Sequence, residues 1–269
     1  MKAVIKNLIQ NIANSIPYGR DIFLLLMKGR LGISYRGVFN NYQQAADAVA
    51  QTTTDYDVIN RNKAVNESNE LKTIDTWFQD IDYPLLFWES KLVTPQCHIL
   101  ELGGSIGHFF YSSQCYHKFP DDIFWTIAEL PEAVKLGAKI AKDRNEQRLS
   151  FIDSSTIDTT QPCNVFVSAG TLQYIDQPLT AILSKLNGLP EHVLIHNLPC
   201  HHNQGIWTLQ NLNLCEVPYY IYNLQELKRD MQKLGYKVIA QWTTPRSIEI
   251  PFHRDLAIEG YLGFYFQQN

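Results

Sequence analysis

Three acidic side chains stand at the predicted carboxyl ends of three successive strands. They are Glu101, Glu129 and Asp153. The first is followed by glycines in the pattern acidic-x-Gly-x-Ser-x-Gly, which ends at Gly107. Glycine lets the backbone turn sharply and pass close to a ligand, and the helix that follows presents backbone N–H groups at its first turn. The pattern therefore predicts a ligand site at one edge of a sheet, where the ends of parallel strands meet.

The spacing of the glycines argues against a dinucleotide. From Gly103, the G-x-G-x-x-G fingerprint requires glycines at the positions of Ser105 and His108. A carboxylate before the glycines would repel a pyrophosphate, whereas it can face an ammonium group. Glu129 can accept hydrogen bonds from both hydroxyls of a ribose, and Asp153 is placed to accept one from an adenine amino group. These features together indicate the sulfonium cofactor S-adenosylmethionine.

The predicted cofactor-binding residues come from the ends of four strands and the turns that follow them. They are Glu101, Gly103, Gly104, Ser105, Gly107, Glu129, Leu130, Asp153, Ser168, Ala169 and Gly170. No metal site is predicted, because the run Cys200-His201-His202 matches no standard zinc spacing.

The candidate catalytic residues lie at the ends of the fourth and fifth strands or shortly after them. A hydroxyl acceptor would need a base, and histidine suits that role because its pKa lies near neutral pH. We predict His196 or His201 as the base and Tyr174 as a positioning hydroxyl in the acceptor wall. A hydrogen-bonded structural role is the alternative for each histidine. His108, just inside the helix after the glycines, is a candidate for contact with the cofactor or for packing in the core.

Alternating strands and helices position these residues. The helices are predicted to start at Gly107, Pro131, Pro178 and Asn223, and Gly235 ends the last of them. A long loop is predicted over 199–218. The fold class is α/β, with a mostly parallel sheet covered on both faces by helices. The predicted strands are 98–102, 123–129, 149–152, 164–168, 192–198, 236–242 and 262–266.

Two segments precede this domain, which we place at 97–269. Residues 1–36 form a basic, helical extension that would pack on its own domain, on a partner or on an anionic membrane surface. Residues 37–96 form a mainly helical cap segment. Its aromatic run 83–88 is a candidate cover for one side of a ligand cleft, or an ordinary packed helix face.

Composition limits the classes of function. The chain has 269 residues and a net charge of −4, which argues against a nucleic-acid-binding surface. Its five cysteines form no C-x-x-C pair, which favours free thiols in a reducing compartment. With neither a signal peptide nor a membrane-spanning run recognised, we expect a cytoplasmic protein, with peripheral contact to the inner membrane through 1–36 as an option. Nothing in the sequence predicts an oligomeric state.

Several stretches resemble the class I S-adenosylmethionine-dependent methyltransferases. They are residues 99–107, 125–131 and 165–178. Together with 35–39 and 217–223, they resemble more narrowly a methyltransferase family encoded with bacterial surface-polysaccharide biosynthesis genes. The resemblance implies a Rossmann-like, seven-stranded sheet whose last strand is antiparallel. It also implies cofactor contacts at the motif positions from Glu101 to Gly107 and at Glu129.

The resemblance implies no known acceptor, and the leading hypothesis is an enzyme that methylates a hydroxyl of a sugar or of a glycan-linked intermediate. The family carries an acid–arginine pair after the fifth strand, where this chain has His196-Asn197, so no acceptor-binding pair is transferred from it. Two alternatives stand beside this function. One is methylation of a small molecule unrelated to glycans, and the other is a catalytically silent methyltransferase-like domain that binds a partner or acts as a scaffold.

Overall fold

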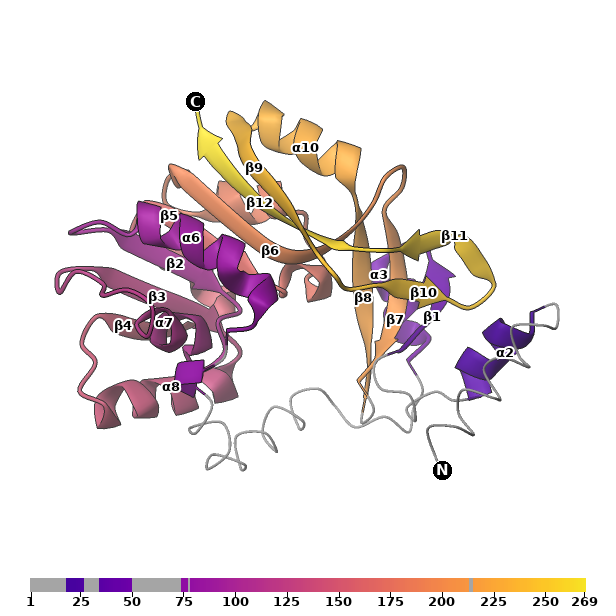
Figure 1. Ribbon diagram of the computed structural model, residues 1–269, viewed down its shortest axis with the longest axis horizontal. Helices are drawn as coiled ribbons and strands as arrows, with labels where there is room; N and C mark the ends of the chain where they lie inside the picture. Colours follow the sequence, from indigo (N-terminus) through magenta and orange to yellow (C-terminus); the bar gives the residue numbers. More distant parts are fainter. Residues whose placement is uncertain (1–17, 27–33, 50–73, 77, 213–214) are drawn as a thin grey trace.

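The computed structural model describes residues 18–26, 34–49, 74–76, 78–212 and 215–269, which are coloured in Figure 1. Within them no helix is both long enough and apolar enough to cross a membrane. The predicted basic extension, 1–36, therefore falls mostly outside the described part. Its described portion includes helix α2 (Gly19–Leu26) and the start of strand β1 (Ser34–Phe39), so the predicted boundary at 36 divides a strand.

Seven strands form the main part of the sheet in the order β4–β3–β2–β5–β6–β12–β9. β12 runs antiparallel to both of its neighbours, whereas the pairs from β4 to β6 are parallel. This is the Rossmann-like α/β fold predicted from the sequence. The strands are β2 (His98–Leu102), β3 (Phe124–Glu129), β4 (Leu149–Asp153), β5 (Val165–Ala169), β6 (His192–His201), β9 (Tyr236–Thr244) and β12 (Tyr261–Gln268).

Helices cover both faces of these strands because the buried strands carry apolar side chains on both faces. On one face, Ile99 and Trp125 pack in a cluster with α6 (Tyr83–Leu92), α7 (His108–Ser113) and α8 (Pro131–Asp143). On the other face, Leu100 and Phe166 pack with α9 (Leu179–Lys185) and α10 (Leu224–Lys233). Asn223 caps α10 by accepting from the amides of Gln225 and Glu226, and Gly235 follows its end with a φ of 96°.

Three further strands make the sheet ten-stranded, so it is larger than predicted. They are β1, β7 (Ile206–Asn211) and β8 (Glu216–Asn223), and β8 joins the end of β6. In Figure 1 they lie at the opposite end of the molecule from β4. The prediction of a loop over 199–218 is therefore wrong, because most of that segment is paired in strands. A hairpin of β10 (Ile248–Ile250) and β11 (His253–Ile258) packs beside them.

The segment predicted as a mainly helical cap, 37–96, is only partly helical in its described portion. It contains the end of β1, helix α3 (Tyr42–Asp47), two short 3-10 turns and α6. Residues 50–73 lie outside the described part. The aromatic run at 83–88 belongs to α6, which packs against β6 and does not line the cavity described next.

Candidate functional site

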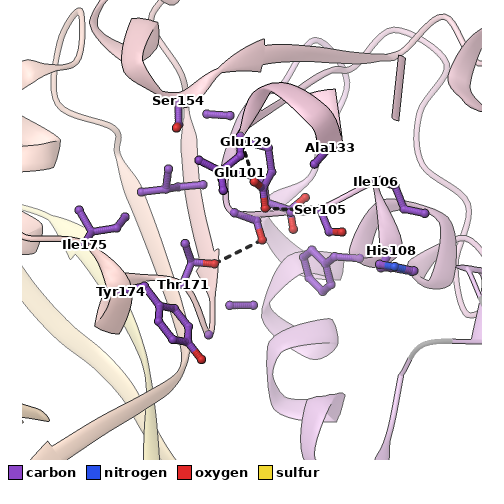
Figure 2. Close-up of a pocket in the computed structure, with 18 of the residues that line it drawn as sticks. Glu101, Ser105, Ile106, His108, Glu129, Ala133, Ser154, Thr171, Tyr174 and Ile175 are labelled. Carbon is purple, nitrogen blue, oxygen red and sulfur yellow. Dashed lines mark hydrogen bonds between the residues drawn. The ribbon is translucent and has the colours of Figure 1, made fainter. Parts of the chain in front are cut away.

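A cavity of about 640 Å³ opens at the carboxyl ends of β2, β3 and β5. Its volume lies within the usual range of small-molecule sites, about 300–1,000 Å³. Figure 2 shows Glu101, Ser105 and Glu129 together in it, with Tyr174 and Ile175 on one side of them. The cavity therefore lies at the edge of the sheet where the sequence predicts a ligand site.

The glycine turn after β2 holds the backbone in conformations that ordinary side chains rarely adopt. Gly103 and Gly107 have φ angles of 80° and 99°, and Ser105 between them has a φ of 53°. A β-carbon at Gly104 would lie 2.5 Å from Cδ of Glu101. Glycine at 104 thus lets the turn pass directly over that carboxyl group, and the backbone of the turn faces the cavity.

Glu101 is the most deeply buried of the acidic residues at the strand ends, at 2% exposure. Its Oε2 accepts a hydrogen bond of 2.9 Å from Nε1 of Trp125. Burial raises the pKa of Glu101 to about 8; the bond from Trp125 opposes this rise, and the negative charges of Glu89 and Glu129 add to it. At neutral pH this carboxyl group is therefore mostly protonated in the free protein.

Glu129 ends β3 beside the glycine turn. Its Oε1 accepts from the backbone N–H of Ser105 at 3.3 Å, and its Oε2 accepts from that of Leu130 at 2.6 Å. Burial raises the pKa of Glu129, and the two backbone bonds oppose the rise. The carboxylate is held in one orientation against the cavity, where it offers acceptor oxygens to hydroxyl donors.

The structure brings most of the predicted cofactor residues to the cavity. Besides Glu101 and Glu129, its lining includes Gly103, Gly104, Ser105, Leu130, Ala169 and Gly170. Three predicted residues do not line it. Gly107 caps the start of α7, Ser168 donates to the carbonyl of Leu102 at 3.1 Å, and Asp153 accepts from the amide of Ser155 at 2.8 Å.

His196 and His201 do not line the cavity, in contrast to their predicted role as bases. His196 is fully buried, with Nε2 2.9 Å from Oδ1 of Asp82 and Nδ1 accepting from Nε1 of Trp242 at 3.0 Å. His201 lies 3.1 Å from the carbonyl of Asp255. The geometry gives both histidines the structural role that was their alternative.

Tyr174 and His108 do line the cavity. Tyr174 lies on the 3-10 turn η4 (Leu172–Tyr174), and its hydroxyl donates to Oε1 of Gln210 on β7 at 2.7 Å. His108 is the first residue of α7 and lies on the side of the glycine turn opposite to Tyr174 (Figure 2). They are the candidates for proton transfer that the geometry leaves at the cavity.

Several lining residues were not predicted. Tyr42, Val217 and Pro218 come from α3 and β8, and no local motif marks them. Ser154 and Thr171 follow predicted strands by two and three positions, so an inspection of every strand end could have found them. In the described part of the chain, no three His, Cys, Asp or Glu side chains gather as metal ligands.

Comparisons with known proteins identify the fold. No protein-family model and no curated protein matches the chain. Magnesium protoporphyrin IX methyltransferase from Synechocystis PCC 6803, solved with bound S-adenosylhomocysteine, is similar with a TM-score of 0.51 and 9% identity, over 80% of this chain and 100% of that one. The 1,6-didemethyltoxoflavin-N1-methyltransferase of Burkholderia thailandensis is 16% identical over 82% of this chain and 95% of that one, with a TM-score of 0.49. The chain thus has the fold of S-adenosylmethionine-dependent methyltransferases.

Proposed function

We propose that this protein binds S-adenosylmethionine in the cavity and transfers its methyl group to an acceptor. The observation that carries the proposal is the orientation of Glu129, whose carboxylate is fixed by the amides of Ser105 and Leu130 next to the glycine turn. A fixed carboxylate at that place suits the two hydroxyls of a ribose. The similar methyltransferase from Synechocystis PCC 6803 binds S-adenosylhomocysteine, the product form of the same cofactor.

The residues of the cavity fit this cofactor. Gly103 and Gly104 line the cavity without side chains, so a ligand can lie close to the backbone of the glycine turn. We assign the ribose to Glu129, the ammonium of the methionine moiety to Glu101, and the adenine to the side formed by Leu130 and Ser154. A cationic ligand group near Glu101 favours its ionised form and so offsets the burial of that carboxyl group.

The bound cofactor would supply an electrophilic methyl group on a sulfonium. The protein would hold the acceptor in line with that group and exclude water, and such alignment can lower the barrier by several kcal/mol. Tyr174 is suited to orient an acceptor hydroxyl, since its own hydroxyl is fixed by Gln210. Tyr174 and His108 are the candidates to take up or pass on the acceptor proton.

For the acceptor, we propose a hydroxyl of a sugar or of a glycan-linked intermediate in bacterial surface-polysaccharide biosynthesis. The support is the resemblance of residues 35–39, 165–178 and 217–223 to the family encoded with such genes. Two of these segments contribute lining residues to the cavity: Tyr174 comes from 165–178, and Val217 and Pro218 come from 217–223. A small-molecule acceptor unrelated to glycans and a silent scaffold are the competing functions.

Titration of the protein with S-adenosylmethionine by calorimetry tests the cofactor. We expect saturable binding, and we expect Glu129→Ala to weaken it by about 10- to 100-fold, the effect of losing hydrogen bonds to a charged group, about 1.5–3 kcal/mol. Glu132→Ala is the matched control, because Glu132 is a half-buried acid on α8 that pairs with Lys135 and does not line the cavity. Equal affinity in Glu129→Ala and the control would refute the ribose assignment, and no binding to the wild type would favour the silent scaffold.

A further inference from the structure

One side of the cavity is built largely by elements outside the seven-stranded part of the sheet. Tyr42 comes from α3, and Val217 and Pro218 come from β8, while η4 contributes Tyr174 with Ile175 beside it. We call these five residues the tyrosine wall. Figure 2 shows Tyr174 and Ile175 on one side of the glycine turn, away from the helix that starts at His108. The tyrosine wall therefore lines the same cavity as the proposed cofactor residues.

The tyrosine wall is aromatic and aliphatic, and it carries no charge. Among the described residues that line the cavity there is no lysine or arginine, whereas two are acidic, Glu101 and Glu129. Arg36 on β1 is already paired with Glu216, through bonds of 2.8 Å from Nε and 2.6 Å from Nη2. A phosphate or carboxylate on the acceptor would lose water there and find no described Lys or Arg side chain to pair with, which opposes binding.

Contacts behind the tyrosine wall hold it in place. The Arg36–Glu216 pair lies directly before Val217, and Nη2 of Arg36 also donates to the carbonyl of Ala48, just past α3, at 2.9 Å. Arg36 thus ties together the helix that carries Tyr42 and the strand that carries Val217. Edge contacts fix both tyrosine rings, that of Tyr42 against Trp207 at 5.2 Å and that of Tyr174 against Tyr219 at 5.2 Å. A surface fixed in this way loses little entropy when a ligand packs on it.

We infer that the tyrosine wall is the acceptor site, and that it takes an uncharged ring whose apolar face packs on the tyrosines and whose hydroxyl points to the cofactor. Tyrosine rings offer rigid area of mixed apolar and polar character, which suits the face of a sugar or of a phenol. This inference rests on the proposed function and makes it narrower. According to this inference, the ring that is methylated carries no charge, and any phosphate of a larger acceptor lies outside the cavity.

Matched pairs of probes test the inference. They are 4-methylphenol with 4-methylphenyl phosphate, and methyl glucoside with glucose 6-phosphate. Their binding is titrated by saturation-transfer NMR on the full chain, with and without saturating S-adenosylhomocysteine. We expect the neutral member of at least one pair to bind about tenfold or more tightly than its phosphate, without displacing S-adenosylhomocysteine. The pair that responds distinguishes a phenol from a sugar. Phosphates that bind equally well, or a neutral probe that displaces S-adenosylhomocysteine, would overturn the inference.

Two variants locate the binding. Val217→Lys places a cation in the tyrosine wall. We expect it to weaken binding of the neutral probe by about tenfold and to strengthen binding of the corresponding phosphate. The control is Val238→Lys on β9, where the side chain is 41% exposed. Tyr42→Ala removes a ring from the tyrosine wall. We expect it to weaken binding of the neutral probe without altering the affinity for S-adenosylhomocysteine.

The outcomes separate the two proposals. If both variants bind the neutral probe as the wild type does, the tyrosine wall is not the acceptor site, even where S-adenosylhomocysteine binds. If the wild type binds no S-adenosylhomocysteine, the proposed function fails, and the titrations without it still show whether the tyrosine wall binds a neutral ring.

Discussion

At the scale of single residues, Glu101 gives the strongest indication of a binding site. A carboxyl group with 2% exposure and a pKa of about 8 is an unfavourable place for a negative charge. The bond from Trp125 satisfies one of its oxygens but does not compensate for the lost hydration. A buried acid of this kind, beside a glycine turn and within a cavity, is more typical of a binding site than of a core that is selected for stability.

This burial predicts a pH dependence of stability. Between pH 4.5, the ordinary pKa of a glutamate, and about 8, folded Glu101 keeps a proton that the unfolded chain has lost. The wild type should therefore lose stability as pH rises through this window and level off above it. Glu101→Gln keeps an acceptor for Trp125 and does not titrate. As pH rises through this window, the free energy of unfolding of Glu101→Gln should increase relative to that of the wild type by up to about 1.4 kcal/mol per pH unit.

Urea unfolding of both proteins at several values between pH 5 and 9 measures this difference. Glu132→Gln serves as the control, because its carboxylate is solvent-accessible and paired with Lys135. Parallel curves for Glu101→Gln and the wild type across that range would mean that folding does not raise the pKa of Glu101.

At the scale of elements, helix α8 shows how closely the helices must approach the sheet to shape the cavity. Its Ala133 and Leu136 line the cavity, and Gly137 faces the ring of Phe151 on β4. A β-carbon at Gly137 would overlap that ring. The absence of a side chain at this position thus lets α8 lie against β4 and places its first turns at the cavity.

We predict that Gly137→Ala is destabilising, although alanine favours a helix by about 1 kcal/mol over glycine. The added carbon must displace Phe151 or the helix, and overpacking of this kind costs about 1–3 kcal/mol. Thermal or urea unfolding measures the effect. Lys142→Ala, on the exposed side of the same helix, should change stability by less than about 0.5 kcal/mol. A Gly137→Ala protein more stable than the wild type would show that helix propensity prevails here.

The elements also show what the sequence can and cannot predict. β2 lies at the residues predicted for it, because its apolar run ends at a glycine turn, which is a local signal. β6 continues three residues further than predicted, through Pro199, Cys200 and His201. This extension depends on pairing with Tyr261 and with Tyr222, partners that local composition does not reveal.

The same distinction applies to the site. The carboxylates and glycines were predictable because strand ends follow from local patterns and meet at one edge of the sheet. The position of the histidines relative to the cavity could not be predicted, because it depends on partners far away in the sequence. Both ring nitrogens of His196, for example, are hydrogen-bonded, one to Asp82 and the other to Trp242. Tyr42 and Val217 were missed for the same reason, since strand pairing alone brings α3 and β8 to the cavity.

At the scale of the whole molecule, a chain of tyrosine hydroxyls joins the added strands to the seven-stranded part. Tyr219 on β8 donates to Tyr261 on β12 at 2.9 Å, and Tyr261 bonds to Tyr35 on β1 at 2.9 Å. Nε2 of Gln210 donates to the hydroxyl of Tyr35 at 3.0 Å, and Tyr174 donates to the same amide group. Burial raises the pKa of Tyr219 and Tyr261, so both remain neutral near physiological pH.

The consequence is that Tyr261 should couple the folding of β1, β7 and β8 to that of the parallel strands. Tyr261→Phe keeps the ring but leaves the hydroxyls of Tyr35 and Tyr219 without this bond, and a buried unsatisfied hydroxyl costs about 1–3 kcal/mol. We expect amide hydrogen exchange to quicken more in β1, β7 and β8 than in β2 and β5. Tyr18→Phe, at a site 63% exposed, should leave the pattern unchanged.

Exchange measured by mass spectrometry on both variants decides whether this coupling exists. If the added strands are held mainly by the tyrosine network, Tyr261→Phe should loosen the tyrosine wall and weaken its neutral probes, while S-adenosylhomocysteine still binds at the glycine turn. Equal acceleration of exchange in β2 and β7 would instead mean that all ten strands unfold as one unit, with the network adding stability to the whole sheet.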